Sequence, residues 1–260
     1  MIALVRERGS DVSRLHKPKA GWMVRAVVVV LYPFSGLMFR VRFRHLDRIP
    51  PTGGVILAAN HISHVDTVLI ARVVWQAGRI PRFMVKSTIF DNPVLGQIMR
   101  RSKQIPVSRG TADAAKSLDA AKAALDAGEA VVIYPEGTIT KDPGQWPMQA
   151  KSGLARLVLL APDVPVIPIG QWGSQQVTGQ GRRHLLRRRA AAASVGHPVD
   201  LADLRQAEPT ARTLVEVTNR IMTAIRDEVA TLRGEDPPTR FYRPPAAGSK
   251  RHRNSMEAAD

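Results

Sequence analysis

Two histidines and an aspartate lie within six residues of each other, directly after an apolar run. His61, His64 and Asp66 follow the segment Gly53–Asn60, GGVILAAN, whose composition is typical of a buried strand. Ionisable side chains beside a buried strand are costly unless they are paired, so each needs a partner or a chemical task. An aspartate that holds one imidazole nitrogen fixes the tautomer and stabilises the cation formed when the other nitrogen takes a proton. His61 and Asp66 are therefore predicted to form a base and its orienting carboxylate, an arrangement suited to activating a substrate hydroxyl.

The pairing of His61 with Asp66 requires the histidine in a loop and the aspartate in the first turn of a helix. A five-residue step on one continuous helix would turn the two side chains apart. Ser63 and Asp66 also have the spacing of a capping box, in which Asp66 would satisfy backbone donors at a helix start. His64 has no comparable spacing to a carboxylate, and we expect it at the surface or at the edge of the core. No metal site is expected, because the other histidines lie in basic or loop contexts: His16, His45, His184, His197 and His252.

Short apolar runs alternate with helical segments through the middle of the chain. This alternation predicts an α/β fold, a single domain with a mixed, partly parallel sheet flanked by helices. The expected strands are residues 53–60, 82–86, 103–109, 130–137 and 164–173, and the expected helices are 66–75, 111–128, 152–161 and 211–233. The expected parts of the chain are a polar basic segment 1–20, an apolar interfacial helical segment 21–45, a domain 46–233 and a disordered basic tail 234–260.

The longest apolar run, Ala26–Phe39, reads AVVVVLYPFSGLMF. It is shorter than the ~20 residues that a membrane-spanning helix needs, and Pro33 interrupts it. Trp22 and a series of arginines flank the run, as in helices that lie in the headgroup layer of a membrane. A buried core helix is the alternative. Residues 1–20 show no secretory signal pattern.

The chain has 38 Lys and Arg against 22 Asp and Glu among its 260 residues, a net charge of +16. Such an excess implies an anionic partner: nucleic acid, an anionic membrane surface or a phosphorylated substrate. The basic run Gly181–Arg189 suits lipid headgroups or forms a solvated loop. Nucleic-acid recognition is disfavoured, because no known binding motif is present and aromatic residues do not interleave with the basic runs. A basic nucleic-acid-binding or membrane-binding protein without catalysis is the alternative from another class.

The chain lacks the residues that two kinds of covalent catalysis require. Cysteine is absent, which excludes disulfides, thiolate metal ligands and a cysteine acyl-enzyme. No Gly-x-Ser-x-Gly sequence is present to supply the serine of an esterase. Covalent catalysis by a cysteine or by a serine in this motif is therefore not expected.

A second motif, YPEGTITKD at Tyr134–Asp142, follows the predicted strand 130–137. Gly137 permits close approach of the backbone, and Thr138 adds a hydroxyl donor. Together with Asn-His-x4-Asp upstream, this motif resembles the glycerolipid acyltransferase family, the kind that acylates lysophosphatidic acid. The motifs that carry the resemblance occur in the family's order and cover about residues 51–173.

The resemblance implies a role for each matching residue. His61 and Asp66 match the catalytic motif, with His61 as general base and Asp66 as its orienting group. Residues that match acceptor-binding positions are Pro135, Glu136, Gly137 and Thr138 in the second motif, Arg109 in IPVSRG for the acceptor phosphate, and Lys86 in MVKSTIF as a further basic position. The run Val164–Gly170, with Pro168 at its centre, matches the family's hydrophobic motif.

The activity that the resemblance implies is transfer of a fatty acyl chain from acyl-CoA or acyl-carrier protein to the sn-2 hydroxyl of lysophosphatidic acid, giving phosphatidic acid. No cofactor and no metal are implied. The expected partners are the thioester donor, a lysophospholipid acceptor and an anionic membrane surface, with no nucleic acid. The expected location is the cytoplasmic face of the cell membrane, as a peripheral or monotopic protein.

Two positions depart from the family pattern. Ile139 stands where the family has the arginine of Glu-Gly-Thr-Arg, and Ser102 and Lys103 occupy a region that often contains a glycine. If the missing arginine holds a phosphate, Lys141 or Lys151 substitutes for it, or the acceptor is another lysophospholipid or a glycolipid. These departures bear on the acceptor more than on the type of reaction.

Overall fold

The computed structural model describes residues 20–108, 113–177 and 188–245. The described helices are α1 (Trp22–Met38), α2 (Asp66–Gln76), α3 (Pro93–Arg101), α4 (Asp113–Asp126), α5 (Gly153–Leu160) and α6 (Ala211–Arg233). The strands are β1 (Phe39–Arg44), β2 (Val55–Ala59), β3 (Pro81–Lys86), β4 (Ile105–Val107), β5 (Ala130–Ile133), β6 (Val166–Trp172) and β7 (Arg189–Val195). Short 3-10 helices are η2 (Leu46–Arg48), η3 (Ser87–Ile89) and η4 (Ser174–Gln176).

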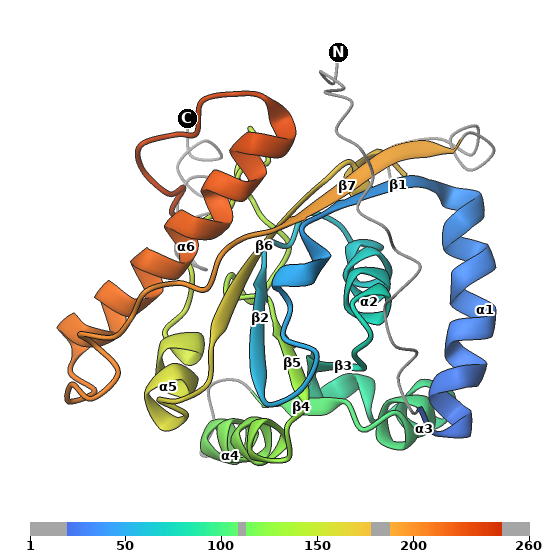
Figure 1. Ribbon diagram of the computed structural model, residues 1–260, viewed down its shortest axis with the longest axis horizontal. Coiled ribbons are helices and arrows are strands. Elements are labelled where there is room, and N and C mark those ends of the chain that lie inside the picture. The colour runs from blue at the N-terminus through green and yellow to red at the C-terminus, as the bar shows by residue number, and fades with distance from the viewer. Residues whose placement is uncertain (1–19, 109–112, 178–187, 246–260) are drawn as a thin grey trace, which may run out of the picture.

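The strands form one mixed sheet in the order β1-β7-β6-β2-β5-β3-β4 (Figure 1). The strands β6, β2, β5, β3 and β4 run parallel to one another, whereas β7 is antiparallel to β6 and parallel to β1. The predicted α/β fold with a mixed, partly parallel sheet is therefore confirmed. The parallel part of the sheet brings the carboxyl ends of five strands to one edge, where α/β folds place their sites.

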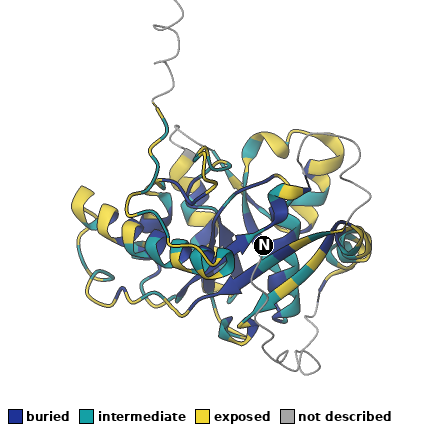
Figure 2. Ribbon diagram, turned by 90° about the horizontal axis from the view of Figure 1, so that it is seen from above, coloured by how far each residue is buried: buried dark blue, intermediate teal, exposed yellow. Residues whose placement is uncertain are grey.

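Side chains on a strand point alternately to the two faces of the sheet. Helices cover both faces of this sheet, so both sets of side chains are buried. Ile56 and Ala58 of β2 pack with α4, α5 and α6, whereas Val55, Leu57 and Ala59 pack on the other face with α2. All five β2 side chains are buried, which explains the continuous apolar run in the sequence. Figure 2 shows this buried sheet between helices whose outward faces are exposed.

Helix α1 lies against α2, α3 and β1 and leaves one apolar face uncovered. Val29, Val30 and Leu37 are 65–70% exposed, and Trp22 and Phe34 extend the same face. Val30, Phe34 and Leu37 are separated by four and three residues, and Trp22 and Val29 by seven, so these side chains lie along one side of the helix. In the part of the chain that the structure describes, no helix combines the length and the apolar character required to cross a bilayer.

The predicted helical segment 21–45 was wrong at its end, because the helix stops at Met38 and residues 39–44 form β1. The sequence FRVRFR alternates with a period of two, with Phe39 buried and Arg40 and Arg42 exposed, as in a half-buried strand. Pro33 lies within α1 without ending it. The bond that a proline cannot donate would go to the carbonyl of Val29, which is itself an exposed residue.

Three further parts of the chain differ from the expectation, the first of them α3 (Pro93–Arg101), which was not predicted. Residues 189–195 form β7, which was not predicted, and its small alanines are hydrogen-bonded between β1 and β6. The first part of the expected tail is placed: Tyr242 forms a backbone bridge with Met148, and Phe241 packs against the core. Residues 246–260 lie outside the described chain, as do residues 1–19.

Close contact between α6 and β6 depends on Gly170. A Cβ atom at this position would lie 2.7 Å from the backbone of Glu228 and Val229. A methyl group therefore cannot be accommodated unless the helix moves away from the sheet.

Both ends of α6 are defined by local signals. Thr210 caps its start by accepting a hydrogen bond from the Thr213 amide, and Gly234 ends the helix with φ of 65°.

We predict that Gly170→Ala lowers the free energy of unfolding by about 1–3 kcal/mol, because the added methyl overpacks the α6–β6 contact. Urea denaturation followed by circular dichroism measures the change. Gly153→Ala is the matched control, since a Cβ atom there meets nothing within 4 Å. Equal stability of Gly170→Ala and wild type would contradict the role given to this contact.

Candidate active site

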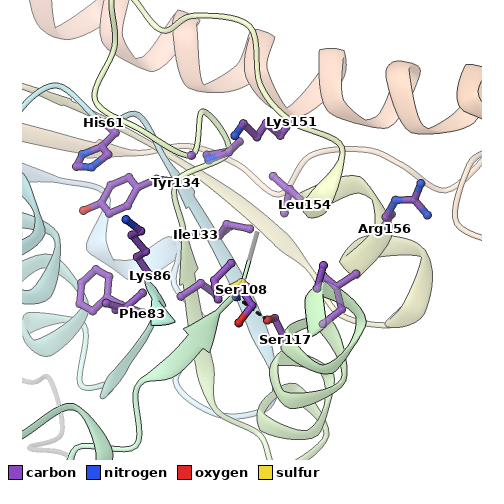
Figure 3. Close-up of a pocket in the computed structure, with 18 of the residues that line it drawn as sticks. His61, Phe83, Lys86, Ser108, Ser117, Ile133, Tyr134, Lys151, Leu154 and Arg156 are labelled. Atoms are coloured by element: carbon purple, nitrogen blue, oxygen red, sulfur yellow. Dashed lines mark hydrogen bonds between the residues drawn. The ribbon is translucent and has the colours of Figure 1, made fainter. Parts of the chain in front are cut away.

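The candidate site lies at the carboxyl edge of the parallel strands. His61 comes two residues after β2, Tyr134 comes directly after β5, and Lys86 is the last residue of β3. Neighbouring parallel strands bring these residues together although they are up to 73 positions apart in the sequence, from His61 to Tyr134. Figure 3 shows the resulting cavity, with His61 and Tyr134 at one end.

Asn60 fixes the point at which the chain leaves β2. Its side-chain oxygen accepts from the Gln171 amide at 2.8 Å, and its side-chain nitrogen donates to the Gln171 carbonyl at 3.1 Å. The Gln171 side chain in turn donates to the Asn60 carbonyl at 2.7 Å. The side chains of Asn60 and Gln171 thus extend the pairing of β2 with β6 by one residue. Because Asn60 is held in this way, the backbone of the next residue, His61, has a fixed position.

The imidazole of His61 is held by the buried carboxylate of Asp66. Nδ1 of His61 lies 2.9 Å from Oδ2 and 3.1 Å from Oδ1 of Asp66, which is fully buried. Oδ2 also accepts from the amides of Ile62 and Ser63. The carboxylate requires the Nδ1–H tautomer, so the lone pair is on Nε2, on the side of the ring away from Asp66. The predicted contact between His61 and Asp66 is present.

Asp66 forms one of the two hydrogen bonds of the capping box that its spacing from Ser63 suggested. Asp66 accepts from the Ser63 amide, as one half of a capping box would. The Ser63 hydroxyl, however, bonds to Ser174 instead of completing the box, and Val65 is the residue that precedes α2. Asp66 therefore shapes the loop and orients the imidazole at the same time. His64 is exposed at the cavity, as expected for a surface position.

Glu136 holds the backbone of His61 and is not open to a substrate. Its side-chain oxygens accept from the amides of His61 at 2.8 Å and Met148 at 3.0 Å, and the residue is 1% exposed. The carbonyl of His61 accepts from Thr140 at 2.7 Å, so the second motif holds both sides of this residue. The predicted substrate contact of Glu136 is replaced by a positioning contact, because burial leaves its side chain no access to the cavity.

Burial raises the pKa of Glu136 to about 8, although the two amide donors favour its charged form. The negative charges of Asp66 and Asp142 raise this pKa further. The carboxyl that holds the His61 backbone thus keeps its proton up to about pH 8.

Tyr134 supports the imidazole from one face. Its ring stacks on His61 with centroids 4.3 Å apart and an interplanar angle of 18°, and Phe83 continues the stack. Burial, with a contribution from Asp66, raises the pKa of Tyr134 well above its ordinary value, so the phenol stays neutral. Sequence reasoning missed this role, for which the only signal was an aromatic residue at the head of the second motif.

A cavity of about 630 Å³ opens beside His61. Lys86, Gly137 and Lys151 line it, together with Ser108 at the end of β4. Thr138 is exposed and does not line the cavity, because the turn at Gly137, with φ of 70°, carries the following residue outward. Arg109 lies outside the described residues, directly after Ser108.

A second, apolar cavity of about 180 Å³ adjoins the first. Thr67, Phe83 and Val85 line both cavities. The inner face of α1 supplies Val24, Val27, Val28, Leu31 and Tyr32 to its wall, opposite residues of α2, β3 and α3. An aliphatic chain placed there would end close to His61.

Arg233 fixes the loop that follows the second motif. Its guanidinium lies 4.0 Å from the ring centre of Trp146 and 4.2 Å from that of Trp172, and it donates to the Gly144 carbonyl. The Trp146 carbonyl accepts from the Thr140 hydroxyl. Since the Thr140 amide also donates to the His61 carbonyl, the end of α6 is connected to the backbone of His61 through one short loop.

His61 is a base with a fixed tautomer, and it lies beside one cavity lined by cations and a second, apolar cavity. Such a base can activate the hydroxyl of a substrate that carries both a negative charge and an apolar chain. Among the described residues, no group of three or more His, Asp, Glu or Cys is arranged to hold a metal ion. The arrangement defines a site for base-assisted attack on an electrophile.

Comparison with known proteins agrees with this class of site. A family model described as Acyltransferase matches residues 40–172, just over half of the chain. The chain therefore belongs to this acyltransferase family, and the resemblance noted from its motifs is confirmed.

The names of several similar proteins refer to glycerolipids. The chain is 26% identical over 162 residues to a chloroplastic 1-acyl-sn-glycerol-3-phosphate acyltransferase of Brassica napus, covering 61% of this chain and 43% of that protein. It is 23% identical over 192 residues to the 1-acyl-sn-glycerol-3-phosphate acyltransferase of Bacillus subtilis, covering 72% of this chain and 87% of that one. It is 27% identical over 169 residues to an N-acylphosphatidylethanolamine synthase of Arabidopsis thaliana, covering 58% and 57%. The chain thus spans less than half of the Brassica relative.

The fold is similar to that of the 1-acyl-sn-glycerophosphate acyltransferase PlsC from Thermotoga maritima. The TM-score is 0.60 at 20% identity, and the match covers 83% of each chain. This similarity supports the mixed sheet and its flanking helices as a common fold.

We predict that the stability of the protein falls as pH rises from about 4.5 to about 8, in part because of Glu136. The pKa of this group is higher in the folded chain than in the unfolded chain. The unfolded state therefore gains by ionising first, which lowers the free energy of unfolding by up to about 1.4 kcal/mol per pH unit. Urea denaturation at several pH values, for wild type and Glu136→Gln, isolates this effect. The stability of wild type relative to Glu136→Gln should fall with rising pH and level off above about pH 8, whereas a constant difference would contradict the raised pKa.

Proposed function

We propose that the protein transfers a fatty acyl chain from an acyl thioester, acyl-CoA or acyl-carrier protein, to the sn-2 hydroxyl of lysophosphatidic acid. The observation that carries this proposal is Nε2 of His61, which has no hydrogen-bond partner among the described residues and lies beside a cavity, with Nδ1 fixed by the buried Asp66. Membership of the acyltransferase family and the activities named for several relatives support it.

In the proposed reaction, Nε2 of His61 takes the proton from the acceptor hydroxyl as its oxygen attacks the thioester carbonyl carbon. The carbon–sulfur bond then breaks, and the leaving thiolate takes the proton from the imidazolium, which restores His61. Asp66 stabilises the imidazolium between these steps. A general base of this kind contributes about 10²–10⁴ in rate, and positioning by the two cavities supplies a further part.

The two cavities suit the two chemical parts of these substrates. The apolar cavity behind Phe83 accommodates part of an acyl chain, and its shared wall with the first cavity places the carbonyl end near His61. Arg109 and Lys86 are the proposed contacts of the acceptor phosphate, with Gly137 leaving room for the headgroup. Another lysophospholipid or a glycolipid is the alternative acceptor, because Ile139 replaces the family arginine.

The exposed face of α1 is the proposed membrane contact. Val29, Val30 and Leu37 would enter the headgroup layer, and the exposed Arg25, Arg40 and Arg42 would contact anionic lipids. The inner face of the same helix lines the apolar cavity, so a lipid substrate would leave the membrane next to its binding site. This arrangement supports a peripheral or monotopic protein, and its location on the cytoplasmic face stays a prediction. Of the basic run Gly181–Arg189, only Arg188 and Arg189 are described.

We predict that His61→Ala and Asp66→Asn each lower kcat for acyl transfer by about 10²–10⁴. In Asp66→Asn the amide oxygen can keep the bonds from Ile62 and Ser63, while the amide nitrogen donates to Nδ1. The proton of the imidazole then moves to Nε2, which can no longer act as a base. Labelled acyl-CoA with lysophosphatidic acid measures the rate, and circular dichroism checks the fold.

His197→Ala is the control for these variants, since His197 is exposed and lies outside both cavities. It should keep the wild-type rate. Turnover at the wild-type rate in a folded His61→Ala protein would remove His61 from the proposed mechanism.

We predict that Val30→Asp weakens binding to vesicles of phosphatidylglycerol and phosphatidylcholine about tenfold or more, because it removes an apolar side chain and adds a charge. Flotation of vesicles with bound protein measures the binding. Val215→Asp is the matched control, because Val215 is also an exposed valine on a helix, 58% exposed, but on α6. Equal weakening by both variants would show that charge alone controls binding and would contradict a specific contact by α1.

A further inference from the structure

The missing arginine of the second motif leaves the acceptor phosphate without one of its expected partners. Ile139 occupies that position and does not line the cavity beside His61. Of the two lysines considered as substitutes from the sequence, Lys141 is exposed and does not line this cavity either. Lys151 does line it.

Lys151 is built into the second motif although it is 14 residues beyond Gly137 in the sequence. Its backbone amide donates to the Pro135 carbonyl at 3.0 Å, which fixes the start of its side chain. The aliphatic part of the side chain passes over Gly137, where an added Cβ atom would lie 3.4 Å from Cδ of Lys151. The glycine of the motif thus makes room for the lysine side chain.

Lys86 and Lys151 enter the cavity from different sides. Figure 3 shows the ammonium end of Lys86 directed toward Tyr134, and the side chain of Lys151 extending toward His61. Arg156, on α5, also lines the cavity but points away from His61 in the same view. Among the described residues, neither Lys86 nor Lys151 forms an ion pair, so both charges are available to an anion.

Helix α5 adds to this positive potential. Its first residue, Gly153, lines the cavity directly after Lys151 and Ser152. The first turn has no side-chain cap and no acidic residue, so its free amides and the helix dipole also favour an anion.

We propose that Lys151 and Lys86 together bind the phosphate group of the acceptor, with Lys151 replacing the arginine absent at position 139. This inference rests on the proposed function for the identity of the acceptor. In a lysophosphatidic acid, only two carbons and one oxygen separate the sn-2 hydroxyl oxygen from phosphorus, so a hydroxyl at His61 places the phosphate beside these two lysines. In an acyl-CoA, the long pantetheine arm separates the thioester from the phosphates, and a thioester at His61 places them elsewhere.

Binding of sn-glycerol 3-phosphate, measured by calorimetry, tests Lys151 without requiring turnover. Lys151→Gln is expected to weaken this binding at least tenfold, because a hydrogen bond between charged groups is lost. Lys151→Arg should retain it, and Lys141→Gln is the matched control that should match wild type. Unchanged binding in a folded Lys151→Gln protein would overturn the inference, whether or not the protein transfers acyl groups.

Kinetics then separate the two sources of phosphate. Lys151→Gln should raise KM for lysophosphatidic acid at least tenfold, leave KM for acyl-CoA unchanged and have little effect on turnover of monoacylglycerol, which lacks the phosphate. A rise confined to KM for acyl-CoA would overturn the inference by assigning Lys151 to the donor. If wild type acylates no acceptor but Lys151→Gln still loses glycerol 3-phosphate binding, the proposed function fails and the phosphate site stands.

Discussion

The buried carboxylate of Asp66 organises the loop in which the candidate base lies. One of its oxygens accepts from two backbone amides and the imidazole together, so the charge is satisfied without solvent. An unpaired carboxylate at this depth would be strongly disfavoured, and the bonds therefore specify both the shape of the loop and the tautomer of His61. The remaining supports act on the same residue: Glu136 and Thr140 hold its backbone, and Tyr134 stacks on its ring.

These supports come from parts of the chain that are far apart in sequence. Adjacent β2 and β5 bring the second motif to His61, and Arg233 at the end of α6 holds the loop that follows this motif. The imidazole therefore depends on the packing of the whole sheet, and rigid placement of a base in this way serves catalysis better than placement on a free loop. A site of this kind is also sensitive to substitutions that touch no substrate.

The parts of the fold that sequence reasoning found are those with local signals. The apolar run of β2, the alanine-rich α4 and the His61–Asp66 spacing each carry their information within a few residues, and all three predictions agree with the structure. The strand β7 has a weak local signal, because alanine has little preference for strands, and it is stabilised by pairing with β1 and β6. The alternation of apolar residues and arginines in FRVRFR was also a local signal for a strand. It was missed because the apolar run before it led us to extend the predicted helical segment to residue 45.

The roles within the second motif required the structure. The sequence shows that Glu136 and Gly137 are adjacent, but in the fold the side chain of Glu136 is buried against the His61 backbone, whereas Gly137 lies beside the side chain of Lys151. The stacking of Tyr134 and the placement of Arg233 between two tryptophans depend on partners about 60 to 90 residues away. No spacing rule reaches across such separations.

The position of β1 has a consequence for how the chain can be shortened. This strand forms one edge of the sheet and covers β7, a strand of small side chains with the sequence RAAAASV. Removal of the first 44 residues, to discard the apolar helix, would uncover the hydrogen-bonding groups of β7 along its whole length. An uncovered strand with few charges is a template for strand addition from another molecule. The truncated protein would therefore exchange an exposed apolar helix face for a tendency to self-associate.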